Sequence, residues 1–209
     1  MTLATVRPWL VALLLGMQAG ASLAAILHGQ VVRVADGDTL TVADGRHRKI
    51  KVRLVGIDAP EKDQPFGRES RAHLASLVLG KTVDVEWDKR DSYGRLIGRV
   101  LIAPSACPAC DKSRDAGLAQ ISAGYAWWYR GESRELAYAD KSRYALAENA
   151  ARARHGGLWA APAPMPPWQW RHGQVGRSSS LLARTRVKIR KARTAILHPF
   201  RTASRRHNS

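Results

Sequence analysis

Two Asp-Gly pairs, Asp36-Gly37 and Asp44-Gly45, constrain the fold of this 209-residue chain more than any other feature. They separate three short runs in which β-branched side chains recur, Gln30–Ala35, Asp38–Val42 and Lys49–Val55. Asp-Gly between runs of this kind is a strong signal for a tight hairpin turn. Pro60 then stops the third run, because proline has no N–H to donate to a neighbouring strand. The pattern predicts a three-stranded antiparallel meander.

The rest of the ordered pattern adds two strands and three helices. The strands are expected at Lys81–Trp87 and Arg95–Ala103, and the helices at Phe66–Leu79, Asp115–Ser122 and Arg134–Arg154. Glycines at the helix ends are typical C-terminal stops. Five short strands, with one helix inserted after the third, predict an α+β fold that is mainly β. We expect an OB-type five-stranded antiparallel barrel capped by about three helices.

Composition divides the chain into four parts. Residues 1–25 have the features of an export signal, with Arg7, an apolar stretch and small residues that suit cleavage after Ala24 or Ala25. The alternative is an uncleaved membrane anchor. Residues 26–160 form the barrel domain, 161–176 an arm rich in proline and tryptophan, and 177–209 a tail. A cleaved signal predicts a periplasmic or secreted protein, which we expect to be a monomer.

Positive charge is concentrated at the C-terminal end. The chain has 34 Lys and Arg against 17 Asp and Glu, a net charge of +17, and residues 172–209 hold ten of the bases and no acid. The remainder therefore carries 24 bases against 17 acids, or +7. This balance favours nucleic acid or an anionic surface as a partner. Residues 177–209 are interpreted either as a basic amphipathic helix that binds such a surface or as a disordered, solvated tail.

The two cysteines lie three residues apart, in Cys107-Pro108-Ala109-Cys110. In an exported chain a structural disulfide is the first interpretation. A free pair is the second, and a redox or metal site the third, because neither a thioredoxin-type pattern nor two further metal ligands lie nearby.

Carboxylates follow the first turn and the third strand. Asp38 comes after Asp36-Gly37, and Asp58 comes at the end of the third strand. In a meander these two points can share one edge of a barrel, where two carboxylates with a backbone carbonyl and water would suit calcium better than zinc. The alternative is that Asp36 and Asp38 are only turn residues.

Glu61, Arg53 and Arg95 complete a possible catalytic set. Glu61 is placed to act as a general base on water. A guanidinium grips two phosphate oxygens at once, which lysine cannot do. Strand alternation places Arg53 on the face of Val55 and Ile57, which we expect to be the barrel interior. A charge there is costly unless it belongs to a site.

These motifs resemble the thermonuclease family, also called staphylococcal nuclease-like, in order and spacing from Gln30 to Trp159. The resemblance implies a nuclease-like OB-fold domain that cleaves DNA and RNA with little sequence preference and leaves 3′-phosphate ends. It implies Ca²⁺ bound by Asp38, Asp58 and the carbonyl of Ala59. By the same resemblance Arg53 and Arg95 hold the phosphate and Glu61 acts on the water.

Some positions depart from the family pattern. Ala59 stands where some members have threonine, Ser92 where a lysine can flank the nucleotide, and the cysteine loop is additional. Tyr93 matches a tyrosine near the bound nucleotide. Trp127 and Tyr129 lie near the region that supplies stacking aromatics, and base stacking or packing inside the protein are both open for them.

Two other functions stay open at this point. One is a non-catalytic nucleic-acid-binding barrel, although a barrel without activity has no need for the acids and arginines. The other is an envelope protein whose basic tail is an anchor.

Overall fold

The computed structural model describes residues 25–131, 136 and 138–173. Residues 1–24 of the predicted export signal and the predicted tail (177–209) lie outside this part of the chain. Strands β1 (Ala25–Val34), β2 (Thr39–Asp44) and β3 (Lys49–Leu54) form the predicted antiparallel meander. Strand β1 begins five residues earlier than predicted, because its first half pairs with β5 (Thr82–Arg90), a partner distant in sequence.

The meander closes into the predicted barrel. The strand order is β3-β2-β1-β5-β6, and β6 (Leu96–Ile102) returns to pair with β3. That closing pair is parallel, whereas the other neighbours are antiparallel. The reason is geometric: in a ring of five strands, alternating directions must leave one pair that runs the same way. The interior is filled by small β-branched and leucine side chains, among them Val31, Leu40, Val52, Val85 and Val100.

Two short additions flank the barrel. Strand β7 (Arg114–Asp115) extends the edge beside β6, and β4 (Ile57–Asp58) pairs with β8 (Trp127–Trp128) in a separate two-stranded sheet. Gly56, with φ of 73°, permits the sharp turn from β3 into β4, and its carbonyl accepts a hydrogen bond from the Tyr129 N–H. The loop before β7 carries a disulfide between Cys107 and Cys110.

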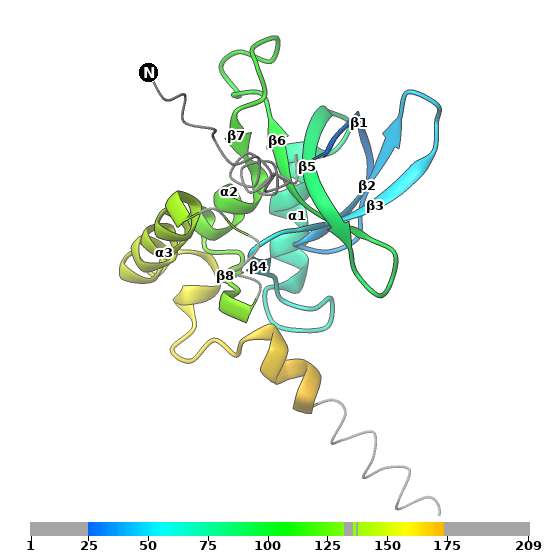
Figure 1. Cartoon of the computed structure of the whole chain (residues 1–209). Coiled ribbons are helices and arrows are strands. Elements are labelled where there is room, and N and C mark those ends of the chain that lie inside the picture. Colours follow the sequence, from blue (N-terminus) through cyan, green and yellow to red (C-terminus); the bar gives the residue numbers. More distant parts are fainter. Residues whose placement is uncertain (1–24, 132–135, 137, 174–209) are drawn as a thin grey trace, which may run out of the picture.

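Three helices cover one side of the barrel, as Figure 1 shows. They are α1 (Gly67–Val78), α2 (Ala116–Ala123) and α3 (Tyr138–Ala153). Asp115 caps α2 by accepting hydrogen bonds from two backbone N–H groups, and its other oxygen accepts one from the buried Tyr144 hydroxyl of α3 at 2.8 Å. The predicted start of the third helix, at residue 134, lies outside the described residues, and the observed helix begins at Tyr138.

The proline-rich arm returns to the domain. After the 3-10 helix Gly157–Ala160 the chain passes several prolines, and residues 167–173 are helical, drawn in orange in Figure 1. The Gln64 amide donates to the Met165 carbonyl, and the Trp168 ring lies against Tyr129 and Trp127. Among the helices that the structure describes, none is long and apolar enough to cross a membrane.

Candidate active site

A cavity of about 330 Å³ opens where the β1–β2 turn meets the end of β3. All the predicted catalytic, metal-binding and nucleic-acid-binding residues except Trp127 line it: Asp38, Arg53, Asp58, Ala59, Glu61, Tyr93, Arg95 and Tyr129. The barrel therefore brings three separate sequence motifs to one place.

The backbone of the first turn is tied to the end of the third strand. The Asp38 carbonyl accepts a hydrogen bond from the Leu54 N–H at 2.8 Å. Its side chain reaches further, because Asp38 Oδ2 accepts from the Ala59 N–H at 2.9 Å. Both aspartates are buried, Asp38 at 5% and Asp58 at 0% exposure. The predicted meeting of these two carboxylates on one barrel edge therefore occurs in the structure.

Arg53 links the two aspartates. One terminal nitrogen lies 3.0 Å from Asp38 Oδ2 and the other 3.4 Å from Asp58 Oδ1. The prediction that Arg53 shares the interior face was wrong: Val52 and Leu54 are its buried neighbours in β3, so Arg53 lies on the opposite face. The alternation cannot be extended to Val55 and Ile57, because β3 ends at Leu54.

Negative charge is crowded in the cavity. Burial raises the pKa of Asp58; the hydrogen bond from Arg171 opposes this shift, and the nearby charge of Asp38 adds to it. Burial, followed by the charge of Asp38, raises the pKa of Asp36 to about 7. Asp36 lines the same cavity although the sequence pattern explained it equally well as a turn residue. The raised pKa values of these two acids therefore come first from burial and then from the repulsion between neighbouring carboxylates.

The donor set fits a hard cation. Oxygen ligands without His or Cys suit calcium or magnesium. In the part of the chain that the structure describes, no three His, Cys, Asp or Glu side chains are arranged to hold a metal by themselves. A cation held by Asp38 and Asp58 would therefore complete its shell with carbonyl and water oxygens, as the sequence predicts.

Arg95 and Tyr93 form the opposite wall. Arg95 Nε lies 2.6 Å from Asp91 Oδ2, and its guanidinium lies 5.4 Å from the centre of the Tyr93 ring. Burial acts to raise the pKa of Asp91, but the hydrogen bonds from Arg95 outweigh it and lower that pKa. The Tyr93 side chain is 83% exposed, so its ring is available at the mouth of the cavity.

Arg171 enters the cavity from the arm, and the sequence analysis did not identify it. Its terminal nitrogens lie 2.8 Å from Asp58 Oδ2 and 2.7 Å from Glu61 Oε1. Hydrogen bonding to Asp58 raises the pKa of Arg171 above its ordinary value. The tryptophans at 168 and 170 indicated that the arm packs on the domain, but no local pattern marked this arginine as part of a site.

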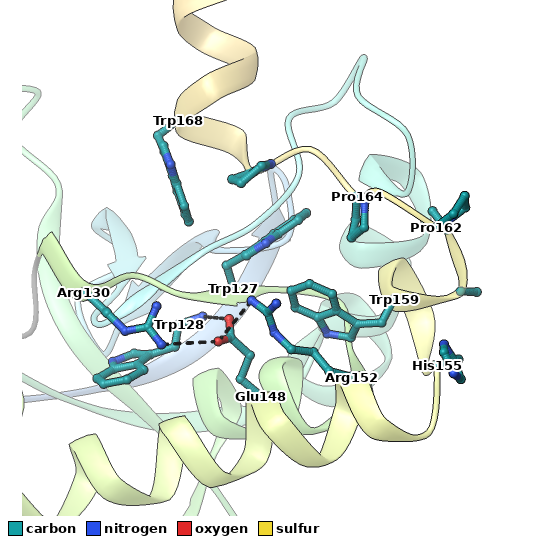
Figure 2. A pocket seen from close by; sticks show the side chains of 13 residues that line it. Trp127, Trp128, Arg130, Glu148, Arg152, His155, Trp159, Pro162, Pro164 and Trp168 are labelled. Carbon is teal, nitrogen blue, oxygen red and sulfur yellow. Dashed lines mark hydrogen bonds and ion pairs between the residues drawn. The ribbon is translucent and has the colours of Figure 1, made fainter.

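Trp127 is buried inside the protein, so it is not available for the base stacking that was one of its two possible roles. It is 4% exposed and packs edge-on against Trp159, with ring centres 5.4 Å apart. It lines a second cavity of about 610 Å³ (Figure 2), where Glu148 contacts Arg130, Arg152 and the backbone N–H of Trp128. Tyr129 does line the acidic cavity, and the centre of its ring lies 5.6 Å from that of Trp168.

Comparisons with known proteins show the family to which the chain is similar. Residues 51–161 match the family described as staphylococcal nuclease homologue. The chain is 43% identical over 150 residues to an uncharacterized endonuclease of Escherichia coli O157:H7, covering 72% of this chain and 88% of the relative. It is 38% identical over 144 residues to a protein of Shigella flexneri named micrococcal nuclease, covering 68% and 79%. It is also 38% identical over 151 residues to Protein ParB of Escherichia coli, covering 72% and 82%.

Proposed function

The chain belongs to the staphylococcal nuclease family, and on this premise we propose that it is a calcium-dependent, sugar-nonspecific phosphodiesterase that hydrolyses DNA and RNA and leaves 3′-phosphate ends. It is a nuclease, and its substrate is nucleic acid. The observation that carries the finer proposal is the cavity itself, in which Asp38, Asp58 and Glu61 face Arg53 and Arg95.

Each of these side chains has one chemical task in the proposed reaction. Asp38 and Asp58 hold the cation, which when bound offsets the negative charge of the phosphate. Arg53 and Arg95 grip the phosphate oxygens. Glu61 takes a proton from the attacking water, which forms a bond to phosphorus while the bond to the 5′ oxygen breaks. The 5′ oxygen takes a proton from solvent water and leaves as a hydroxyl, and the phosphate stays on the 3′ side.

Acceptance of both DNA and RNA follows from what the cavity contacts. Its arginines are suited to phosphate, and phosphate contacts carry no information about base or sugar. The exposed Tyr93 ring offers a surface on which a base can stack without regard to its identity.

We also propose that the protein is exported as a monomer and that its basic tail strengthens polyanion binding. The features of residues 1–25 and the ten Lys and Arg of residues 177–209 support this. A surface-anchoring role for the tail is the alternative.

The test is digestion of single-stranded DNA and of RNA by the purified chain, with calcium and with a calcium chelator. Glu61→Gln should lose cleavage that the wild type shows only with calcium. Glu69→Gln is the matched control, because it makes the same change on the exposed face of α1. End-labelling of products before and after phosphatase treatment reports the 3′-phosphate. Tight binding without cleavage in every condition would replace the enzyme with a binding module.

A further inference from the structure

Arg171 contacts two of the predicted site carboxylates, Asp58 and Glu61, from the proline-rich arm. One terminal nitrogen lies 2.8 Å from Asp58 Oδ2, and the other lies 3.2 Å from Asp58 Oδ1 and 2.7 Å from Glu61 Oε1. Both oxygens of the fully buried Asp58 carboxylate are therefore engaged by the one guanidinium. This residue comes 113 positions after Asp58, so the contact depends on how the arm is docked.

The arm is anchored independently of Arg171. Trp168 lies one helical turn earlier, on the same side of the helix, and its ring packs on Tyr129 at 5.6 Å between ring centres. The Gln64 amide donates a hydrogen bond to the Met165 carbonyl, which fixes the chain just before this helix. These contacts deliver the Arg171 side chain to the cavity mouth, where it is 45% exposed.

We propose that Arg171 and the calcium ion compete for Asp58, so that the docked arm limits binding of the ion. This inference rests on the proposed calcium-dependent function. The guanidinium supplies one positive charge to carboxylates that the cation would otherwise neutralise. Both oxygens of Asp58 already accept a hydrogen bond from Arg171, so an ion bound to this carboxylate would share its oxygens with the guanidinium, and the two positive charges would repel one another.

The same guanidinium also contacts the proposed base, because one of its nitrogens donates to Glu61 Oε1 at 2.7 Å. Arg171 thus holds a metal ligand and the Glu61 carboxylate at once. Its displacement by calcium would release both carboxylates together and would lower the apparent affinity for the ion by the cost of breaking these contacts.

The test is calcium binding to the full chain by titration calorimetry, for wild type, Arg171→Ala and Arg171→Lys. Without the Arg171 guanidinium the ion no longer competes with this side chain for Asp58, so we expect Arg171→Ala to bind calcium at least ten-fold more tightly. Arg171→Lys keeps the positive charge but cannot fork across two oxygens, and it should also bind more tightly than wild type. Arg46→Ala removes the same charge from the exposed turn between β2 and β3 and should leave the calcium affinity unchanged.

A second readout follows the arm directly. The guanidinium ¹⁵N resonances of Arg171, assigned by their absence from Arg171→Ala, should shift when calcium is added and not when sodium chloride is added. Circular dichroism of each variant checks that it is folded.

The outcomes separate the two proposals. Calcium bound equally well, or more weakly, by Arg171→Ala overturns the competition and leaves the proposed function standing. An absence of calcium binding in both wild type and Arg171→Ala overturns the proposed calcium dependence, and the competition falls with it.

Discussion

Glu148 and Asp58 are two buried carboxylates, each contacted by two arginines, yet their surroundings differ. Glu148 is 2% exposed and Asp58 0%. Glu148 Oε1 accepts from the Trp128 N–H, and its other oxygen pairs with Arg152, one turn along the same helix, and with Arg130. Asp58 lies beside other carboxylates and is contacted by Arg53 and by an arginine from the distant arm.

The difference separates a structural carboxylate from a functional one. The single negative charge of Glu148 is balanced by two arginines and by a hydrogen bond from a backbone N–H, so this carboxylate is fully paired by nearby residues. Asp58 shares its cavity with Asp36 and Asp38, and burial together with the charge of Asp38 raises its pKa. Crowded, buried acids of this kind are typical of functional sites, and the proposed function assigns a cation to them. The two sites therefore respond to substitution in opposite ways.

The largest expected effect is on catalysis at Asp58. Asp58→Asn should lower the cleavage rate by about 10²–10³-fold or more, because a metal ligand is lost. The free energy of unfolding in chelator should change by less than about 1 kcal/mol, because removing one of several crowded charges relieves repulsion. Cleavage kinetics and urea denaturation measure the two quantities. A strongly destabilised variant would place Asp58 in the same structural class as Glu148.

Arg95→Ala tests the phosphate-binding wall. We expect a loss on the order of 10²–10³-fold in rate, because a charge that stabilises the transition state is removed. The fold should survive, since Arg95 pairs with Asp91 in a partly exposed turn. Steady-state cleavage with calcium present is the measurement. Unchanged turnover would exclude Arg95 from the site.

Glu148→Ala should show the reverse pattern. The free energy of unfolding should fall by about 2–4 kcal/mol, because the Trp128 N–H loses its acceptor and a cavity is left. The cleavage rate per folded molecule should stay near that of wild type. Glu148→Gln keeps the acceptor and the volume, so its cost should be smaller. Loss of cleavage in a fully folded Glu148→Ala protein would link the second cavity to the reaction.

A third buried carboxylate, Asp115, provides a second example of a carboxylate with a structural role. Tyr144→Phe removes its hydroxyl donor and should cost about 1–3 kcal/mol in the free energy of unfolding. Burial already raises the pKa of Asp115 above 3.8, and loss of the Tyr144 hydrogen bond should raise it further. A raised folded-state pKa means that stability is lost as pH rises, so the deficit should be larger at pH 7 than at pH 4. Urea denaturation at both values gives the comparison, and a deficit that is larger at pH 4 would contradict it.

Removing residues 177–209 should have the smallest effect on the chemistry. The deletion takes away ten Lys and Arg, so DNA binding should weaken and depend less steeply on salt. The rate at saturating DNA should be nearly unchanged, because the cavity lies within residues 36–171. Binding measured over a salt series, together with the cleavage rate, tests this. Loss of envelope retention with activity on free DNA intact would identify the tail as an anchor.

The sequence by itself determined the features that depend on near neighbours. The Asp-Gly turns specified the meander, and the strand count specified a barrel of OB type. The motifs around Asp38, Asp58, Glu61 and Arg95 each carry their chemistry locally, so all four could be assigned to one site before the structure was known. The short helix expected at Asp115–Ser122 was likewise indicated by the glycine that follows it, whereas its Asp115 cap became evident only in the structure.

Only the tertiary structure decided the features that depend on contacts between distant segments. The N-terminal extension of β1 exists because β5 pairs with it. The face of Arg53 was misassigned because β3 ends at Leu54, so strand alternation does not continue to Val55 and Ile57. The burial of Trp127 and the entry of Arg171 require the arm to fold back across the domain. Periodicity and turn signals reach only a few residues along the chain, whereas burial, pKa and ion pairing are set by whatever the fold brings alongside.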